Sequence, residues 1–139
     1  MTTPNSWNEH NAEVIARFRA TRGQSSQRSG QTILLLGTTG AKTGLPRTNP
    51  LAYLPGDDCL YIFASKGGAA NHPDWYRNLV ANPNVTVEVD DETYEAIAET
   101  VTGPERDAIY AKQAALRPNF GDYQRNTTRI IPVVALRRG

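Results

Sequence analysis

The sequence lacks the features typical of secreted, membrane-spanning and metal-binding proteins. Cys59 is its only cysteine, so no intrachain disulfide can form and nothing points to secretion. No apolar run approaches the ~20 residues that cross a bilayer, and the N-terminus lacks the charged start and apolar core of a signal peptide. His10 and His72 have no companions at metal-ligand spacing, so we assign no metal. We therefore expect a cytoplasmic protein.

The net charge is small, but the charged residues are unevenly placed along the chain. The 139 residues suit one compact core, and a net charge of +1 gives no general attraction to nucleic acid. From Val14 to Gly56 there is no Asp or Glu, whereas Arg106 is the only basic residue between Asp90 and Asp107. A basic half suits an acidic small-molecule ligand, although an ordinary solvated surface also produces such a pattern.

Hydrophobic periodicity predicts an N-terminal amphipathic helix followed by a chain rich in hairpins. We divide the chain into an N-terminal helix and loop over residues 1–30 and a cofactor-binding domain over residues 31–139. Closely spaced strands favour a mostly antiparallel sheet, curled into a small barrel with helices over its openings, and disfavour a parallel fold. The expected fold class is α+β, mainly β. The predicted strands cover 32–36, 48–54, 59–64, 85–89, 93–102 and 129–136, and the predicted helices cover 7–20, 73–81 and 104–117.

Two basic turns that contain glycine carry the strongest functional signal. Lys42 and Arg47 flank the first turn, and the second, Ser65-Lys66-Gly67-Gly68, follows a short apolar strand. Glycine lets the backbone approach a ligand closely, and consecutive N–H groups can converge on anionic oxygens. The hairpin over residues 48–64 has the right length to bring both turns to one rim. A basic surface hairpin is the alternative interpretation, since the first turn does not match a Walker A loop.

Aromatic residues follow the second turn. Trp75 and Tyr76 offer a wall for a planar ring, although core packing is the commoner role of such side chains. Asn78 would either orient a ring edge or cap local backbone. Farther on, Phe120 and Tyr123 would either roof a pocket or pack a loop onto the barrel. Ser65 has no convincing histidine and carboxylate partners in the sequence, so nothing supports a hydrolase triad.

Several of these segments, in this order and at these intervals, resemble the deazaflavin (F420)-dependent nitroreductase family, which is similar to F420H2-dependent quinone reductases. The similarity covers roughly residues 31–136 and implies a split β-barrel of the FMN/F420-binding type. It also implies coenzyme F420, a 5-deazaflavin whose tail holds a phosphate and oligoglutamate carboxylates. The motifs that carry the resemblance are Thr39-Gly40-Ala41-Lys42-Thr43-Gly44-Leu45-Pro46-Arg47, Asn49-Pro50-Leu51, Ala64-Ser65-Lys66-Gly67-Gly68, Pro73-Asp74-Trp75-Tyr76-Arg77-Asn78-Leu79, Asn82-Pro83 and Arg129-Ile130-Ile131-Pro132-Val133.

The family pattern also implies roles for individual residues. The residues expected to hold the acidic tail are Lys42, Thr43, Arg47, Lys66, Gly67 and Gly68. Those expected to line or support the ring are Pro50, Leu51, Ala64, Ser65, Trp75 and Asn78. Tyr123, Ser65 or water would protonate the product. The chain has Ala52 where relatives that reduce bulky nitro compounds often carry Tyr, so their substrates are not carried over.

The implied activity is hydride transfer from reduced F420 to a small-molecule acceptor, which would be a quinone, a conjugated enone or a nitroaromatic. Two alternatives stay open at this point: a non-catalytic F420 carrier, and a protein that holds FMN in the same barrel. The helix over residues 7–20 would either lie on a membrane surface or fold over the active site. We expect no nucleic-acid partner, and the sequence leaves the oligomeric state open.

Overall fold

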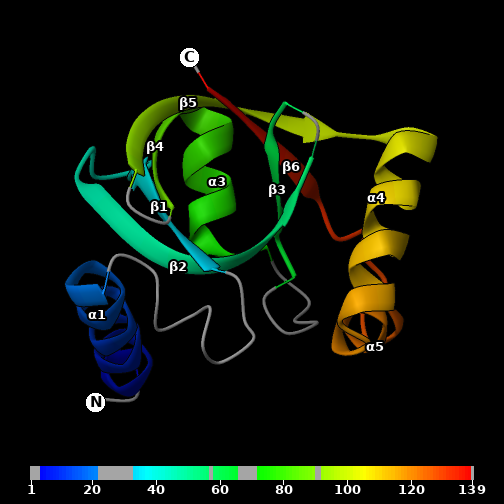
Figure 1. The fold of residues 1–139 in the computed structure, drawn as a ribbon, viewed down its shortest axis with the longest axis horizontal. Coiled ribbons are helices and arrows are strands. Elements are labelled where there is room, and N and C mark those ends of the chain that lie inside the picture. The colour runs from blue at the N-terminus through cyan, green and yellow to red at the C-terminus, as the bar shows by residue number, and fades with distance from the viewer. Residues whose placement is uncertain (1–3, 22–32, 57, 66–71, 90–91, 139) are drawn as a thin grey trace.

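Six antiparallel strands close into a barrel in the order β1-β2-β3-β6-β5-β4 within the residues that the computed structural model describes, which are 4–21, 33–56, 58–65, 72–89 and 92–138 (Figure 1). Pairing between β1 and β4 completes the ring. The predicted antiparallel barrel is therefore confirmed. The strands are β1 (Ile33–Thr39), β2 (Pro46–Pro55), β3 (Leu60–Phe63), β4 (Asn84–Val89), β5 (Glu92–Val101) and β6 (Val133–Arg138).

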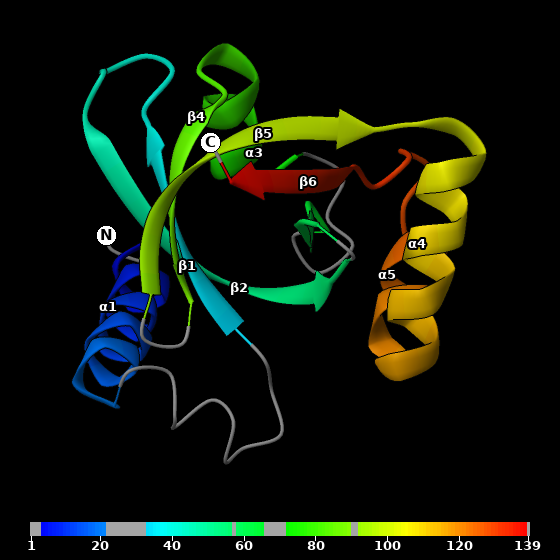
Figure 2. The same ribbon diagram turned by 45° about the horizontal axis from the view of Figure 1, so that its top comes forward.

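The helices lie at three places around this barrel. α1 (Pro4–Thr21) and the pair formed by α4 (Gly103–Leu116) and α5 (Asn119–Arg125) lie on opposite sides of it in both views (Figures 1 and 2). α3 (Asp74–Ala81) lies within the ring of strands in the view of Figure 1. None of the helices in the described part of the chain combines the length and apolarity that a membrane span requires.

Period-two alternation along the strands sorts apolar side chains into two cores. Val134 and Leu136 of β6 belong to the cluster inside the barrel, which α3 completes with Trp75 and Leu79. Val133 and Ala135 point the other way, into a second cluster shared with α4 and α5. The barrel thus buries its inner face against α3 and part of its outer face against the α4–α5 pair.

Pro50 occupies a position in β2 where its missing N–H costs little. It pairs with Leu35 of β1, whereas β3 pairs with β2 only from Tyr53 to Pro55. The side of Pro50 away from β1 therefore has no strand partner, as is typical of proline in a sheet.

Two elements of the structure differ from the prediction. The last strand begins at Val133 rather than at residue 129, because β3 pairs only with residues 133–136 of β6 and Pro132 has no N–H to donate. Helix α5 was not predicted; packing of Phe120 against Phe63 and a hydrogen bond from Tyr110 Oη to the Phe120 carbonyl hold it in place. Tertiary contacts, rather than local propensity, account for this short helix.

Candidate functional site

A cavity of about 600 Å³ opens at the end of the barrel where β1 turns into β2. Cavities of this size accommodate small ligands and cofactors. Its walls come from α1, from the β1–β2 turn, from the first residues of β2 and from the first turn of α3. The lining residues are Ala12, Ile15, Gly40, Ala41, Lys42, Thr43, Arg47, Thr48, Asn49, Asp74, Trp75, Arg77 and Asn78.

The β1–β2 turn is held in one conformation by its own hydrogen bonds. The Gly40 amide donates to the Leu45 carbonyl at 2.8 Å, and the Gly44 amide donates to the Gly40 carbonyl at 2.9 Å. Gly44 has a φ of +69°, a conformation that suits glycine. A side chain at Gly40 would bring its Cβ within 2.6 Å of the Thr43 hydroxyl. Both glycines are therefore required by the shape of the turn.

These internal bonds decide which amides can bind a ligand. The Leu45 amide donates to Thr43 Oγ1 at 3.2 Å, and the Ala41 amide donates to Asn78 Oδ1 at 3.0 Å. Within the described part of the chain, the amides of Lys42 and Thr43 donate to no protein acceptor. Of the turn amides that were expected to converge on a ligand, these two therefore stay available to bind one.

Two hydrogen bonds of the Asn78 side chain join the β1–β2 turn and the end of β1 to α3. Its Oδ1 accepts from the Ala41 amide, and its Nδ2 donates to the Thr38 hydroxyl at 3.2 Å. The side chain is only 8% exposed, so these bonds are shielded from water. The structure assigns Asn78 the backbone-capping role, one of the two that the sequence left open, at the border of the cavity.

Three exposed cations surround the cavity. Lys42 and Arg47 come from the turn and from β2, as predicted, and Arg77 joins them from α3. None of the ion pairs in the described part of the chain involves any of the three. Among the described residues that line the cavity, Asp74 is the only acid. The local field therefore favours an anion.

The sequence reading missed Arg77 and Asp74, although a signal for them was present. Trp75 and Asn78 were selected from the same helix, and they lie three residues apart. Asp74 and Arg77 have the same spacing, which puts them on the adjoining strip of the helix surface. Helical periodicity applied to this segment would have added both residues to the predicted site.

Helix α1 supplies an apolar wall of the cavity. Ala12 and Ile15 line it, and Phe18 is buried at 3% exposure. Arg19 fixes the helix to β4 through two bonds to the Glu88 carboxylate, Nε to Oε1 at 3.1 Å and Nη2 to Oε2 at 2.7 Å. Helix α1 therefore lies against the cavity.

The residues predicted around the ring lie deeper in the fold. Leu51, Ala64 and Trp75 share the cluster inside the barrel, and of these Trp75 also borders the cavity. Pro50 lies beside Leu51 on β2, outside the cavity lining. Three predicted tail-binding residues, Lys66, Gly67 and Gly68, lie outside the described residues.

The two predicted proton donors have different surroundings. Ser65 is 8% exposed, and its carbonyl accepts a hydrogen bond from Arg129 at 2.8 Å. Tyr123 packs against the second cluster, and its hydroxyl accepts from the Asn119 side-chain amide at 2.8 Å. An accepted bond leaves the phenolic proton of Tyr123 available for donation. Neither residue borders the cavity described above.

A family model for F420H(2)-dependent quinone reductases matches residues 8–138. The chain belongs to this family. It is 40% identical over 128 residues to an F420H(2)-dependent quinone reductase of Mycobacterium tuberculosis (strain ATCC 25618 / H37Rv), an alignment that covers 88% of this chain and 86% of the relative. The predicted resemblance is thus confirmed.

Solved structures agree with this assignment. An F420-H2 dependent reductase (FDR-A) superposes with a TM-score of 0.69 at 37% identity, over 76% of this chain and 93% of that one. A second structure, described as a domain-swapped dimer, gives a TM-score of 0.71 at 32% identity, over 96% of this chain and 99% of that one. Coenzyme F420 is the cofactor of the family, and this confirms the predicted F420-dependent oxidoreductase over the FMN and carrier alternatives.

The cavity fits the acidic tail of that cofactor. Lys42, Arg47 and Arg77 are exposed cations around it, and the Lys42 and Thr43 amides donate to no acceptor in the described part of the chain. Phosphate and carboxylate groups are the ligands that such donors bind best. Asp74 opposes them with a single negative charge.

Proposed function

We propose that this protein reduces a quinone with reduced F420, and that the cavity at the β1–β2 turn holds the acidic tail of the cofactor. The observation that carries the proposal is the set of three cations around one cavity, none of them in an ion pair within the described part of the chain. Family membership supplies the reaction class.

Tail binding would draw on Lys42, Arg47 and Arg77 together with the amides of Lys42 and Thr43. Exposed ion pairs contribute about 0–1 kcal/mol each, whereas charge-assisted hydrogen bonds to partly buried groups contribute about 1.5–3 kcal/mol. Since the three cationic side chains are exposed, the lower range applies to them. Tail contacts alone would therefore give modest affinity, and burial of the ring supplies the remainder.

Leu51, Ala64 and Trp75 would form the apolar support of the ring, with Pro50 beside them on β2. When bound, reduced F420 supplies a hydride, so that two electrons reach the acceptor in one step. The apolar support excludes water from one face of the ring site and leaves the other face to the acceptor. Conversion of a quinone to its hydroquinone also requires one proton, for which we propose Tyr123 or Ser65 as the donor.

Helix α1 would close one side of the site. Ala12 and Ile15 bring apolar surface to the cavity, and Phe18 is buried, so these side chains face the protein. This arrangement favours a covering role for α1, while peripheral membrane contact through residues 7–20 stays a prediction. The side chain of Trp7, on which the membrane prediction partly depended, lies outside the described residues.

The acceptor class follows from the family for quinones and stays a prediction for enones and nitroaromatics. Ala52 lies on β2, and it packs against the cluster that contains Phe120. Relatives that reduce bulky nitro compounds often carry Tyr at the position of Ala52, so we expect quinones to be reduced faster than nitroaromatics.

A binding titration followed by rapid mixing tests the proposal. Purified protein titrated with F420 should show saturable binding, and stopped-flow mixing of the reduced complex with menadione should oxidise the cofactor faster than protein-free F420H2. A protein that binds F420 without accelerating its oxidation by menadione would be a carrier. Absence of binding by well-folded protein would rule out the proposed function.

A further inference from the structure

Arg129 joins the end of β3 to the start of α3. Its Nη2 donates to the carbonyl oxygen of Ser65 at 2.8 Å, and its Nη1 lies 3.0 Å from Nδ1 of His72. β3 ends at Phe63, and α3 begins at Asp74, so the two contacts bracket the connection between these elements. One guanidinium therefore holds both ends of this connection, which lie 64 and 57 residues from Arg129 in the sequence.

The contact with His72 fixes the state of the imidazole. A guanidinium carries donors only, so Nδ1 must accept, and the ring proton then resides on Nε2. Partial burial and the positive charges of Arg129 and Arg77 lower the pKa of His72, which favours this neutral form. The imidazole also contacts the ring of Tyr76, with centroids 4.9 Å apart, on the first turn of α3.

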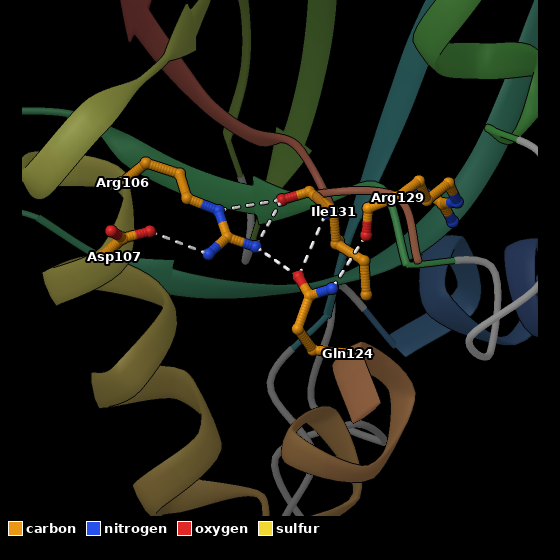
Figure 3. Close-up of polar contacts among 5 residues, drawn as sticks. All are labelled: Arg106, Asp107, Gln124, Arg129 and Ile131. Carbon is orange, nitrogen blue, oxygen red and sulfur yellow. Dashed lines mark hydrogen bonds and ion pairs between the residues drawn. The ribbon is translucent and has the colours of Figure 1, made fainter. Parts of the chain in front are cut away.

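The backbone that carries Arg129 is itself held by a buried clasp, formed by Arg106 and Gln124 (Figure 3). Gln124 donates from Nε2 to the Arg129 carbonyl at 2.8 Å, and its Oε1 accepts from the Ile131 amide at 3.1 Å. Arg106 donates to the Ile131 carbonyl from Nε at 3.1 Å and from Nη2 at 2.8 Å. These bonds hold the backbone from Arg129 to Ile131, which belongs to no strand. The side chain of Arg129 therefore extends from a backbone that is fixed in place.

Of the two elements that Arg129 joins, α3 lines the cavity, and β3 leads into Ser65, one of the residues expected at the ring. α3 brings Trp75, Arg77 and Asn78 to the cavity, and Ser65 follows β3. We propose that Arg129 is a positioning residue for cofactor binding, because its two-pronged contact with Ser65 and His72 sets the end of β3 and the first turn of α3 relative to each other. This inference rests on the proposed function.

Two substitutions separate the two-pronged contact from the charge. Arg129→Gln removes both the charge and the second donor, and Arg129→Lys keeps the charge but offers a single donor centre. Misplacement of a binding group by a fraction of an ångström is expensive, so we expect Arg129→Gln to bind F420 about tenfold more weakly than wild type. Arg129→Lys should give an intermediate affinity. Arg125→Gln is the matched control, because Arg125 is an exposed arginine of α5 that pairs with Asp122.

Two measurements are made on each folded variant. F420 affinity is measured by calorimetric titration, and the His72 titration is followed by NMR of its imidazole signals. Loss of the neighbouring cation in Arg129→Gln should raise the pKa of His72, whereas Arg125→Gln should leave both quantities as in wild type. A change in stability alone would not move the His72 titration in this way.

The outcomes separate this inference from the proposed function. Wild-type F420 affinity and an unchanged His72 titration in Arg129→Gln would overturn the role of Arg129. Should that variant fail to fold, Arg129→Lys decides: wild-type affinity overturns the inference, and intermediate affinity supports it. Failure of the wild-type protein to bind F420 would instead overturn the proposed function, while the His72 titration would still test the contact itself.

Discussion

Two regions of the molecule, the outer face that packs on α4 and α5 and the barrel end at the β1–β2 turn, use arginine in opposite ways. On the side of α4 and α5, Arg106 is 9% exposed and donates to the Ile131 carbonyl, the Gln124 amide oxygen and the Asp107 carboxylate. At the β1–β2 turn, Arg47 and Arg77 are exposed and form no ion pair within the described part of the chain. Saturated, buried bonds indicate a structural cation, and unsaturated, exposed donors beside a cavity indicate a binding one.

We expect the largest effect from replacing Arg106, the buried arginine. Arg106→Met would remove the donors to the Ile131 carbonyl and to Gln124 while keeping most of the aliphatic stem. Each buried acceptor left without a partner costs about 1–3 kcal/mol, so we expect the free energy of unfolding to fall by roughly 3 kcal/mol. Denaturant unfolding measures this change, with Arg125→Gln on the exposed face of α5 as the control. A loss under about 0.5 kcal/mol, the range of ordinary surface substitutions, would contradict the structural role.

Replacing the exposed cations around the cavity should have the reverse effect, on binding rather than on stability. Lys42→Ala, Arg47→Ala and Arg77→Ala should each weaken F420 binding by up to about fivefold, or ~1 kcal/mol, with little change in stability. The loss should grow with the number of glutamates in the tail, which fluorescence titrations with short-tailed and long-tailed F420 would reveal. Lys112→Ala, an exposed lysine of α4, is the control. Equal affinity in all four variants would remove these cations from the site.

Asp74 sharpens the comparison because it is the one acid among the described lining residues. Asp74→Asn keeps the size of the side chain and removes a charge that repels phosphate and carboxylates. We expect F420 to bind about two- to threefold more tightly, a change of less than ~1 kcal/mol at an exposed position. The same titration with added salt should reduce the difference between variant and wild type. Weaker binding by Asp74→Asn would mean that this carboxylate accepts a bond from the ligand.

The smallest effect concerns pH. Because the pKa of His72 is lowered in the folded protein, the unfolded chain binds its proton first as the pH falls through the ordinary value of 6.5. The free energy of unfolding should therefore decrease through that range and level off below the folded pKa. Melting temperatures of wild type and His72→Gln across this range measure the contribution as a difference. A wild-type protein that loses no more stability than the variant would contradict the assigned shift.

The barrel was predictable because its strands are closely spaced and because apolar and polar residues alternate along β4. Val85, Val87 and Val89 all face the inner cluster, as their spacing predicts. Helix α5 was not predictable from local pattern, since Gly121 lies inside it and Pro118 precedes it, and both are typical of loops. Its stability comes from Phe120, whose ring packs on Phe63 from a distant strand.

The candidate site was predictable where charge and glycine coincide, and less so where contacts depend on folding. Lys42, Thr43 and Arg47 line the cavity as the turn chemistry predicts, and Trp75 joins them. The place of Ile15 in the cavity wall could not be predicted, because α1 ends at Thr21 and the barrel begins only at Ile33, so the sequence does not fix where the helix lies. The hydrogen bond from the Ala41 amide could not be predicted either, because its acceptor, Asn78, lies on a separate helix.

Calorimetric titration with F420 at low and high salt, for wild type and for the triple variant Lys42→Ala/Arg47→Ala/Arg77→Ala, tests the central assignment most directly. Wild type should bind the cofactor with an affinity that falls as salt rises, and the triple variant should bind more weakly with little dependence on salt. Equal affinity and equal salt dependence in the two proteins would show that the acidic tail of F420 lies somewhere other than this cavity.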